Sequence, residues 1–195
     1  MQKRFPSVLV FSKDNEGVSA ARNLGLAKRT GSMFYSLTRM MHICLIPCLC
    51  WLKRLNEIKL RWCLSILRRY SRWLHRGRPV EYSFPDVKQV LGMSALSMIY
   101  AEHIGYFSWA FMYDRQFLVD LHILYPQGFA LLEDALFLNK ILRQCSRVAY
   151  VSKPCYRYRI TEGSLSKRTS LATVDSAFKS LSEIQTNSAF GRFLH

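Results

Sequence analysis

The chain has 195 residues, of which half are hydrophobic and 21% are charged, a composition that fits one globular domain and excludes an intrinsically disordered protein. It carries 28 Lys and Arg against 13 Asp and Glu, and a net charge of +15 ordinarily indicates nucleic acid or an anionic membrane surface as partner. The excess is local, because residues 33–78 hold ten basic side chains and one acid, whereas residues 79–195 hold twelve basic and ten acidic. The same segment contains four of the six cysteines and three of the four tryptophans, so its origin needs an explanation.

Membrane and export signals are weak. The longest apolar candidate, His42–Leu52, is about half as long as the roughly 20 residues that a spanning helix needs. The N-terminal MQKRFPSVLVF lacks the apolar core and cleavage site of a secretory signal, and without export the cysteines are expected to be reduced thiols. We therefore expect a cytoplasmic protein, with peripheral contact to the inner face of the membrane left open.

The N-terminal elements are predicted from apolar runs and capping residues. Ser7–Ser12 is a short β-branched run that favours a buried strand, and a turn follows it. Val18–Arg29 is predicted as a helix, with Asn15 or Ser19 available for capping at its start and Gly31 after its end. Between residues 51 and 73, apolar residues recur at helical spacing and arginines lie between them, a pattern typical of a basic amphipathic helix.

Beyond residue 79 the pattern alternates between strands and helices, which favours an α/β layered domain. The first predicted elements are a helix followed by apolar packing over Pro85–Ile99, a strand leading into a helix over Trp109–Leu118, and a loop over Leu124–Leu132. A helix is then predicted over Glu133–Cys145, and a strand over Arg147–Ser152 that ends at Lys153-Pro154. The last predicted element is an amphipathic helix over Thr169–Ile184.

Two groups of motifs carry a family resemblance. Asn15–Leu26 reads NEGVSAARNLGL, and Thr30-Gly31 follows it. This segment resembles the family 2 glycosyltransferases, in which a sequence like NxGxSxARNxGL follows the second nucleotide-binding strand of the GT-A fold. The later matches to the family are Trp109–Arg115, Tyr125–Gly128 (YPQG), Glu133–Phe137 (EDALF), Tyr156–Arg159 (YRYR) and Gly163–Ser166 (GSLS).

The resemblance implies the fold class and the organisation of the chain. The expected fold is α/β, an incomplete GT-A-like layered sheet with flanking helices. Residues 1–32 would be a remnant of the nucleotide-binding half, residues 33–78 an anomalous basic segment, residues 79–170 the acceptor-side half, and residues 171–195 a C-terminal amphipathic helix and tail. The implied partners are a nucleotide-sugar donor and a polysaccharide or lipid-linked glycan acceptor, with no specific nucleic acid.

The same resemblance implies site residues. Asp134 would be the base that takes the proton of the acceptor hydroxyl, and Glu133 would orient the acceptor or the base. Arg22 and Asn23 would line the donor nucleotide site, and Trp109 would stack on an acceptor sugar. Each residue also has a simpler explanation: acids are favoured in the first turn of a helix, Arg22 and Asn23 could be solvated helix residues, and a lone tryptophan is more often part of a core.

The chain departs from the family where a divalent metal should bind. The family normally starts with strands resembling VSVIIPVYN and a second ending in DDGS, neither of which occurs in this sequence. The family also has a strand ending in Asp-x-Asp, whose carboxylates hold Mg²⁺ or Mn²⁺ against the donor diphosphate. No Asp occurs here between Asp14 and Asp86. We therefore expect no metal ligands and no bound metal in this chain, and catalysis that is lost or severely impaired.

We hypothesise that a change of reading frame accounts for this departure. In the alternate frame, each codon consists of the third base of one original codon and the first two bases of the next. Because methionine has a single codon, the junction of Met40 with Met41 must then encode Asp, and the junction of Met41 with His42 must encode Ala. With allowed codons elsewhere, Met33–Trp51 can be reread as VLFFDADDAYLPDTLSML, which contains the missing motif. A second shift near Arg76–Pro79 would restore the frame. The basic excess would then mark altered coding sequence.

Two rival interpretations of the basic segment do not involve catalysis. One is nucleic-acid binding by arginines with interleaved aromatic residues, although the chain has no recognised nucleic-acid motif. The residues concerned are Arg54, Arg61, Arg68, Arg69 and Arg72, with Trp51, Trp62, Tyr70 and Trp73. The other is a membrane-surface helix that places Trp51, Leu55, Ile58 and Trp62 in lipid.

A zinc site in the same segment is a third alternative. Its candidate ligands are His42, Cys44, Cys48, Cys50 and Cys63. Their spacing matches neither paired CxxC motifs nor a zinc finger, so the sequence does not favour zinc.

Overall fold

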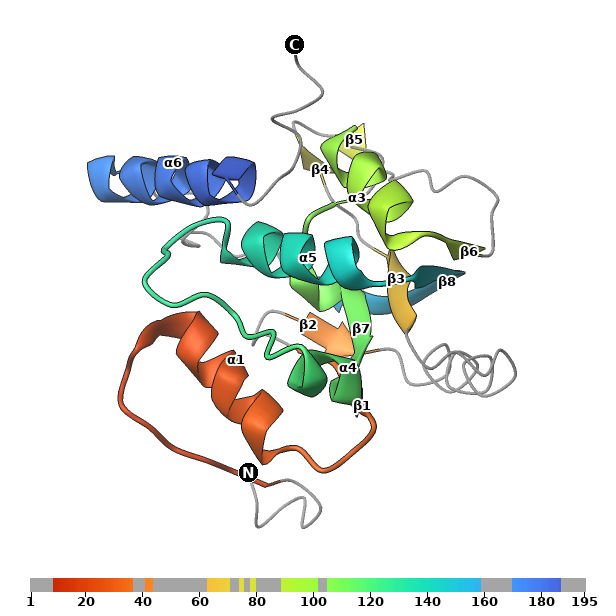
Figure 1. Ribbon diagram of the computed structural model, residues 1–195, viewed down its shortest axis with the longest axis horizontal. Coiled ribbons are helices and arrows are strands. Elements are labelled where there is room, and N and C mark those ends of the chain that lie inside the picture. The colour runs from red at the N-terminus through yellow and green to blue at the C-terminus, as the bar shows by residue number, and fades with distance from the viewer. Residues whose placement is uncertain are drawn as a thin grey trace.

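A computed structural model of the chain describes residues 9–36, 41–43, 63–70, 74–75, 78–79, 89–101, 105–158 and 170–186. It contains a six-stranded mixed sheet and a small two-stranded sheet, with helices that pack against the larger sheet and against one another (Figure 1). The helices are α1 (Gly17–Lys28), α3 (Gly92–Tyr100), η1 (Ser108–Ala110), α4 (Arg115–Asp120), α5 (Glu133–Gln144) and α6 (Leu171–Thr186). The strands are β1 (Met33–Phe34), β2 (Met41–Ile43), β3 (Cys63–Tyr70), β4 (Leu74–His75), β5 (Arg78–Pro79), β6 (Gln89–Val90), β7 (Phe111–Asp114) and β8 (Arg147–Tyr158).

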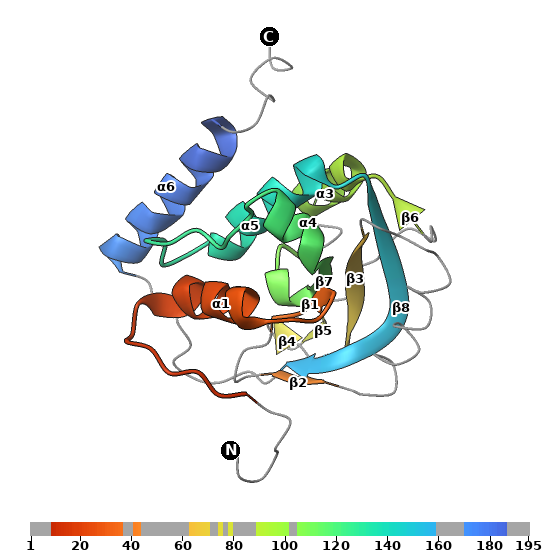
Figure 2. The same ribbon diagram turned by 60° about the horizontal axis from the view of Figure 1, so that its bottom comes forward.

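The main sheet has the strand order β1-β7-β3-β8-β2, and β6 also pairs with β8. β3 and β8 are parallel, whereas the other neighbouring strands are antiparallel. Figure 2 shows the long, curved β8 with α1, α3 and α5 on one side of it and β6 on the other. Helices and sheet thus form the α/β layers that the sequence predicts.

The core lies between the sheet and the helices α3 and α5. In α5, the residues predicted to share one face are buried, from Leu138 through Ile141 and Leu142 to Cys145 at the helix end. Phe111 and Val148 of the neighbouring strands are fully buried against this face. Removal of this apolar surface from water is the main force that holds the layers together.

Several predicted elements are confirmed, because their signals are local. α1 begins beside Asn15, whose Oδ1 accepts a hydrogen bond from the Gly17 N–H at 3.3 Å. β7 leads directly into α4, and Asp114 caps that helix by accepting a hydrogen bond from the Phe117 N–H at 3.0 Å. α5 and α6 also lie within one or two residues of their predicted bounds.

Two predictions in the first half of the chain are wrong. Leu9–Ser12, the described part of the predicted Ser7–Ser12 strand, pairs with none of the described strands, and Leu9 is 68% exposed. Cys63–Tyr70, within the predicted amphipathic helix, forms β3 instead, between β7 and β8. Hydrogen bonds to two neighbouring strands override the helical spacing of its apolar residues. The rest of the predicted helix lies outside the described residues.

Two boundaries also differ from the prediction. The helix predicted within Pro85–Ile99 begins only at Gly92, after the short strand β6. β8 continues past Pro154 to Tyr158, although a proline cannot donate to a ladder. Pro154 lies opposite Arg68, where the register between β3 and β8 shifts, and this irregularity accommodates the missing donor.

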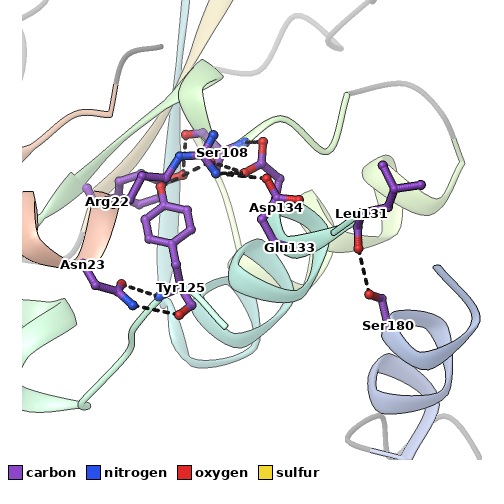
Figure 3. Close-up of polar contacts among 9 residues, drawn as sticks. Arg22, Asn23, Ser108, Tyr125, Leu131, Glu133, Asp134 and Ser180 are labelled. Atoms are coloured by element: carbon purple, nitrogen blue, oxygen red, sulfur yellow. Dashed lines mark hydrogen bonds and ion pairs between the residues drawn. The ribbon is translucent and has the colours of Figure 1, made fainter. Parts of the chain in front are cut away.

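α6 packs through its polar edge rather than its apolar stripe. Ser176 Oγ accepts hydrogen bonds from the backbone N–H groups of Ala130 and Leu131, and Ser180 Oγ donates to the Leu131 carbonyl at 2.8 Å. The apolar stripe that predicts this helix is largely exposed, with Phe178 at 66%. Serine hydroxyls therefore attach α6 to the loop that precedes α5 (Figure 3).

Gly92 allows α3 to approach the end of α5 closely. A Cβ atom at this position would lie 2.3 Å from the carbonyl oxygens of both Leu142 and Cys145. We expect Gly92→Ala to lower the free energy of unfolding by about 1–3 kcal/mol or more, measured by urea denaturation. Gly25→Ala is the matched control, because a Cβ there meets open space within α1, and it should raise stability by about 0.5–1 kcal/mol. Equal effects of the two substitutions would contradict this packing.

Candidate functional site

Two carboxylates lie at the N-terminus of α5. Glu133 and Asp134 are its first two residues, and Leu132 before them adopts a left-handed conformation with φ of 63°. This backbone turns the chain out of the preceding loop and into the helix. The positive end of the helix dipole favours both negative charges.

Arg22 of α1 contacts both carboxylates. Its Nη1 lies 2.6 Å from Asp134 Oδ1 and 3.2 Å from Glu133 Oε1. The arginine side chain is 8% exposed, and the carboxylate side chains are 16% exposed or less. Figure 3 shows Arg22 pointing from α1 toward the start of α5. A buried charge cluster therefore joins segments that are more than 110 residues apart in sequence.

Ser108 of η1 holds Asp134 from the other side. Its Oγ donates to Asp134 Oδ1 at 2.7 Å, and its backbone N–H donates to Asp134 Oδ2 at 3.3 Å. The serine hydroxyl in turn accepts a hydrogen bond from the Tyr125 hydroxyl at 3.2 Å. The Ser108 carbonyl accepts a hydrogen bond from the Tyr113 hydroxyl. Ser108 is fully buried, so this network is shielded from water.

Asn23 binds the backbone of Tyr125 with both ends of its amide. Its Nδ2 donates to the Tyr125 carbonyl at 2.9 Å, and its Oδ1 accepts from the Tyr125 N–H at 2.8 Å. The Tyr125 ring stacks on Phe137 of α5, with centroids 3.7 Å apart, and the Arg22 guanidinium lies 5.0 Å from its centre. α1 is thus docked on α5 through Tyr125 as well as through the ion pairs.

The electrostatics of the cluster follow from its burial and its charges. Burial, with the nearby Asp134 charge, raises the pKa of Glu133, and Arg22 only partly opposes this rise. Burial alone would lower the pKa of Arg22, but attraction to Asp134 and Glu133 outweighs it and raises the pKa, so the guanidinium stays charged. Burial also raises the pKa of Tyr125, which keeps its hydroxyl protonated as a donor to Ser108.

The residues of this cluster do not fit a divalent metal. No group of three or more His, Cys, Asp or Glu side chains within the described parts of the chain could hold one. Both carboxylates already contact the guanidinium of Arg22, so a Mg²⁺ or Mn²⁺ ion bound to them would have to displace that cation. The expected position of Asp-x-Asp, after β1, lies outside the described residues.

Glu133→Gln should change how stability depends on pH. Because the folded-state pKa of Glu133 is raised, its contribution to stability is fully present below its unfolded pKa of about 4.3 and is lost as the pH rises through the folded pKa. The glutamine variant has no such loss. We expect the stability of E133Q relative to the wild type to increase between pH 4 and pH 7, measured by urea unfolding. A difference that stays constant or falls would contradict this environment for Glu133.

The structure brings together four of the five residues that the resemblance implies. Arg22, Glu133 and Asp134 are in direct contact, and Asn23 reaches the same cluster through Tyr125. Trp109 follows Ser108 in η1, but its side chain is buried in the core, 5% exposed, with its ring stacked on Phe107 at 5.0 Å. Stacking of Trp109 on a sugar stays a prediction that this placement does not support.

Sequence patterns alone do not indicate the residues that fix Asp134. Ser108 precedes the Trp109–Arg115 match and Tyr113 lies within it, but nothing in that match indicates their contacts around Asp134. Tyr125 begins the YPQG match, yet nothing in that match indicates that its hydroxyl reaches Ser108. These roles depend on contacts between distant segments, which local patterns do not record.

The rival interpretations of the basic segment fall largely outside the described residues. Arg68, Arg69 and Tyr70 lie in β3, His42 lies in β2, and Cys63 begins β3. For residues 41–43 and 63–70, only the backbone is described. Among the helices that the structure describes, none has the length and apolar character needed to cross a bilayer. The remaining residues named for nucleic-acid, membrane or zinc binding in this segment are not described: Trp51, Arg54, Leu55, Ile58, Arg61, Trp62, Arg72, Trp73, Cys44, Cys48 and Cys50.

Comparison with solved structures identifies the fold. The chain is similar to S. aureus TarS 1–349 in complex with UDP-GlcNAc, with a TM-score of 0.69 and 17% identity over 92% of this chain and 50% of that chain. It is also similar to S. aureus TarS (TM-score 0.66, 17% identity, 89% of this chain and 28% of that chain) and to TarS 1–349 in complex with UDP (TM-score 0.65, 16% identity, 88% and 46%). TarS is a glycosyltransferase of the GT-A type, so the chain has a GT-A glycosyltransferase fold.

The comparisons also limit what can be carried over. The chain spans about half the length of the TarS 1–349 chain that it matches. No protein-family model matches the sequence, and neither does any curated protein. The similarity therefore shows the fold, and the reaction is a matter of proposal.

Proposed function

We propose that this chain is a family 2-like glycosyltransferase remnant, whose ancestral reaction transfers a sugar from a nucleotide-sugar donor to a polysaccharide or lipid-linked glycan acceptor. The observation that carries the proposal is the buried cluster in which Arg22 and Ser108 hold Asp134 at the start of α5. The GT-A fold supports it, as do the complexes of TarS with UDP-GlcNAc and UDP. A buried carboxylate with fixed partners is the kind of group that serves as a general base.

In the ancestral reaction, Asp134 takes the proton of the acceptor hydroxyl. The hydroxyl oxygen forms a bond to the anomeric carbon, the bond from that carbon to the donor diphosphate breaks, and the nucleotide leaves with the electron pair. Glu133 lies beside Asp134 and orients the acceptor or the base. Arg22 and Asn23 lie in α1, and the resemblance expects them to line the donor nucleotide site. Their contacts connect α1 with the carboxylate pair.

The present chain is proposed to be catalytically impaired. In the family, the carboxylates of Asp-x-Asp hold Mg²⁺ or Mn²⁺, which neutralises the donor diphosphate. The sequence lacks aspartate throughout residues 15–85, where the resemblance expects Asp-x-Asp. A shifted reading frame across about residues 32–78 accounts for this departure and for the local basic charge.

The direct test is donor turnover by the purified 195-residue chain. We expect no release of UDP from UDP-GlcNAc above the enzyme-free rate, with Mg²⁺ or Mn²⁺ present and with a glycan acceptor added. Binding of UDP, measured by calorimetry in the same samples, separates loss of catalysis from loss of the donor site. Donor transfer or hydrolysis by this chain would overturn the proposed impairment.

A further inference from the structure

We propose that Ser108 is a positioning residue for Asp134, which fixes Oδ1 as an anchored oxygen and leaves Oδ2 as the oxygen that receives the proton. This inference deepens the proposed function and rests on it for the chemical role of Asp134. The structural part, the fixed orientation of one carboxylate, can be tested without any sugar transfer.

The two oxygens of Asp134 have unequal surroundings. Oδ1 accepts from Arg22 Nη1 at 2.6 Å and from Ser108 Oγ at 2.7 Å, and both are short, strong hydrogen bonds. Oδ2 accepts from the Ser108 N–H at 3.3 Å, a long and weak contact. Each carboxylate oxygen offers about two lone pairs, so Oδ1 is saturated by its two donors and Oδ2 retains capacity for a proton.

Ser108 can hold this orientation because it is itself fixed. The Tyr125 hydroxyl donates to Ser108 Oγ, which directs the serine proton away from Tyr125 and toward Asp134. The Tyr113 hydroxyl donates to the Ser108 carbonyl and fixes the backbone whose N–H points at Oδ2. Tyr125 is held in turn by its stack on Phe137. Because Ser108 is fully buried, water cannot replace these donors.

The arrangement also separates the roles of Ser108 and Arg22. Arg22 shares its Nη1 between Glu133 and Asp134 and supplies charge, whereas Ser108 contacts Asp134 with two donors of different direction. Two donors from one residue define the plane of the carboxylate as well as its position. Loss of the serine hydroxyl therefore frees the carboxylate to rotate while the ion pair with Arg22 persists.

The test is the ¹³C resonance of the Asp134 side-chain carboxyl in the full chain, assigned by its disappearance in D134N. We expect it to move in Ser108→Ala, to move less in Tyr125→Phe, and to return toward the wild-type position in Ser108→Thr, which keeps a hydroxyl. Tyr125→Phe preserves the ring stack on Phe137, so it keeps the test valid if Ser108→Ala does not fold. Ser97→Ala is the control, because the Ser97 hydroxyl donates to the Met93 carbonyl on the exposed face of α3 and the resonance should not move.

An unchanged Asp134 resonance in folded S108A, or in Y125F, would overturn the proposal. So would a resonance in S108T that stays at the position of the alanine variant. Neither outcome depends on turnover. The positioning of Asp134 can therefore fail while the proposed glycosyl transfer stands, and the proposed glycosyl transfer can fail while the positioning of Asp134 stands.

Discussion

Arg22→Met should lower the free energy of unfolding by about 3–5 kcal/mol at pH 7. The substitution keeps a flexible apolar side chain but removes the cation that contacts Glu133 and Asp134. Both carboxylates then stay largely buried without a positive partner, and leaving a buried charge unpaired costs about this much. Urea unfolding followed by circular dichroism at pH 7 measures the change.

Two controls separate the charge effect from general damage to α1. Arg29→Met removes an exposed arginine just after the same helix and should change stability by no more than about 0.5 kcal/mol. Adding E133Q and D134N to R22M should recover much of the loss, because neutral amides need no cation. Equal effects of R22M and R29M, or no recovery in the triple variant, would show that the buried pair does not stabilise the fold as described.

A gene that encodes residues 33–78 in the alternate frame, preceded by the two nucleotide-binding strands that the resemblance expects, should give a protein that turns over UDP-GlcNAc in the presence of Mg²⁺ or Mn²⁺. The rereading introduces the Asp-x-Asp sequence after β1, where the resemblance expects the metal carboxylates. In that restored protein, Asp134→Asn should lower turnover by about 10²–10⁴-fold, the contribution typical of a general base. UDP release measures both effects.

The reading-frame hypothesis also has a test at the level of DNA. The coding sequence must offer aspartate codons in the alternate frame at the junctions of Leu37 with Thr38 and of Arg39 with Met40, because only the junction of Met40 with Met41 is forced. A gene recoded with synonymous codons in the original frame is the control for the activity assay, and it should stay inactive. A coding sequence without these codons would exclude the hypothesis.

The sequence predicted best those elements whose signals are local. α1 is bounded by a turn residue before it and basic residues and a glycine at its end, and α5 has first-turn acids and an apolar face, so their bounds could be read within about two residues. The strands were harder, because a strand forms only where a neighbour pairs with it. Leu9–Ser12 has the composition of a strand but no described partner, whereas Cys63–Tyr70 has helical spacing but lies between two strands.

By itself, the sequence determined the α/β class and the chemistry available to the site: a guanidinium and an amide on one helix, and two adjacent acids at the start of another. It also located the anomalous charge in residues 33–78. Only the tertiary structure decided that Arg22 contacts Glu133 and Asp134, that Trp109 is buried, and that Ser108 orients the carboxylate. The physical reason is that residue types and periodicity act over a few neighbouring residues, whereas burial and hydrogen-bond partners depend on segments brought together from across the chain.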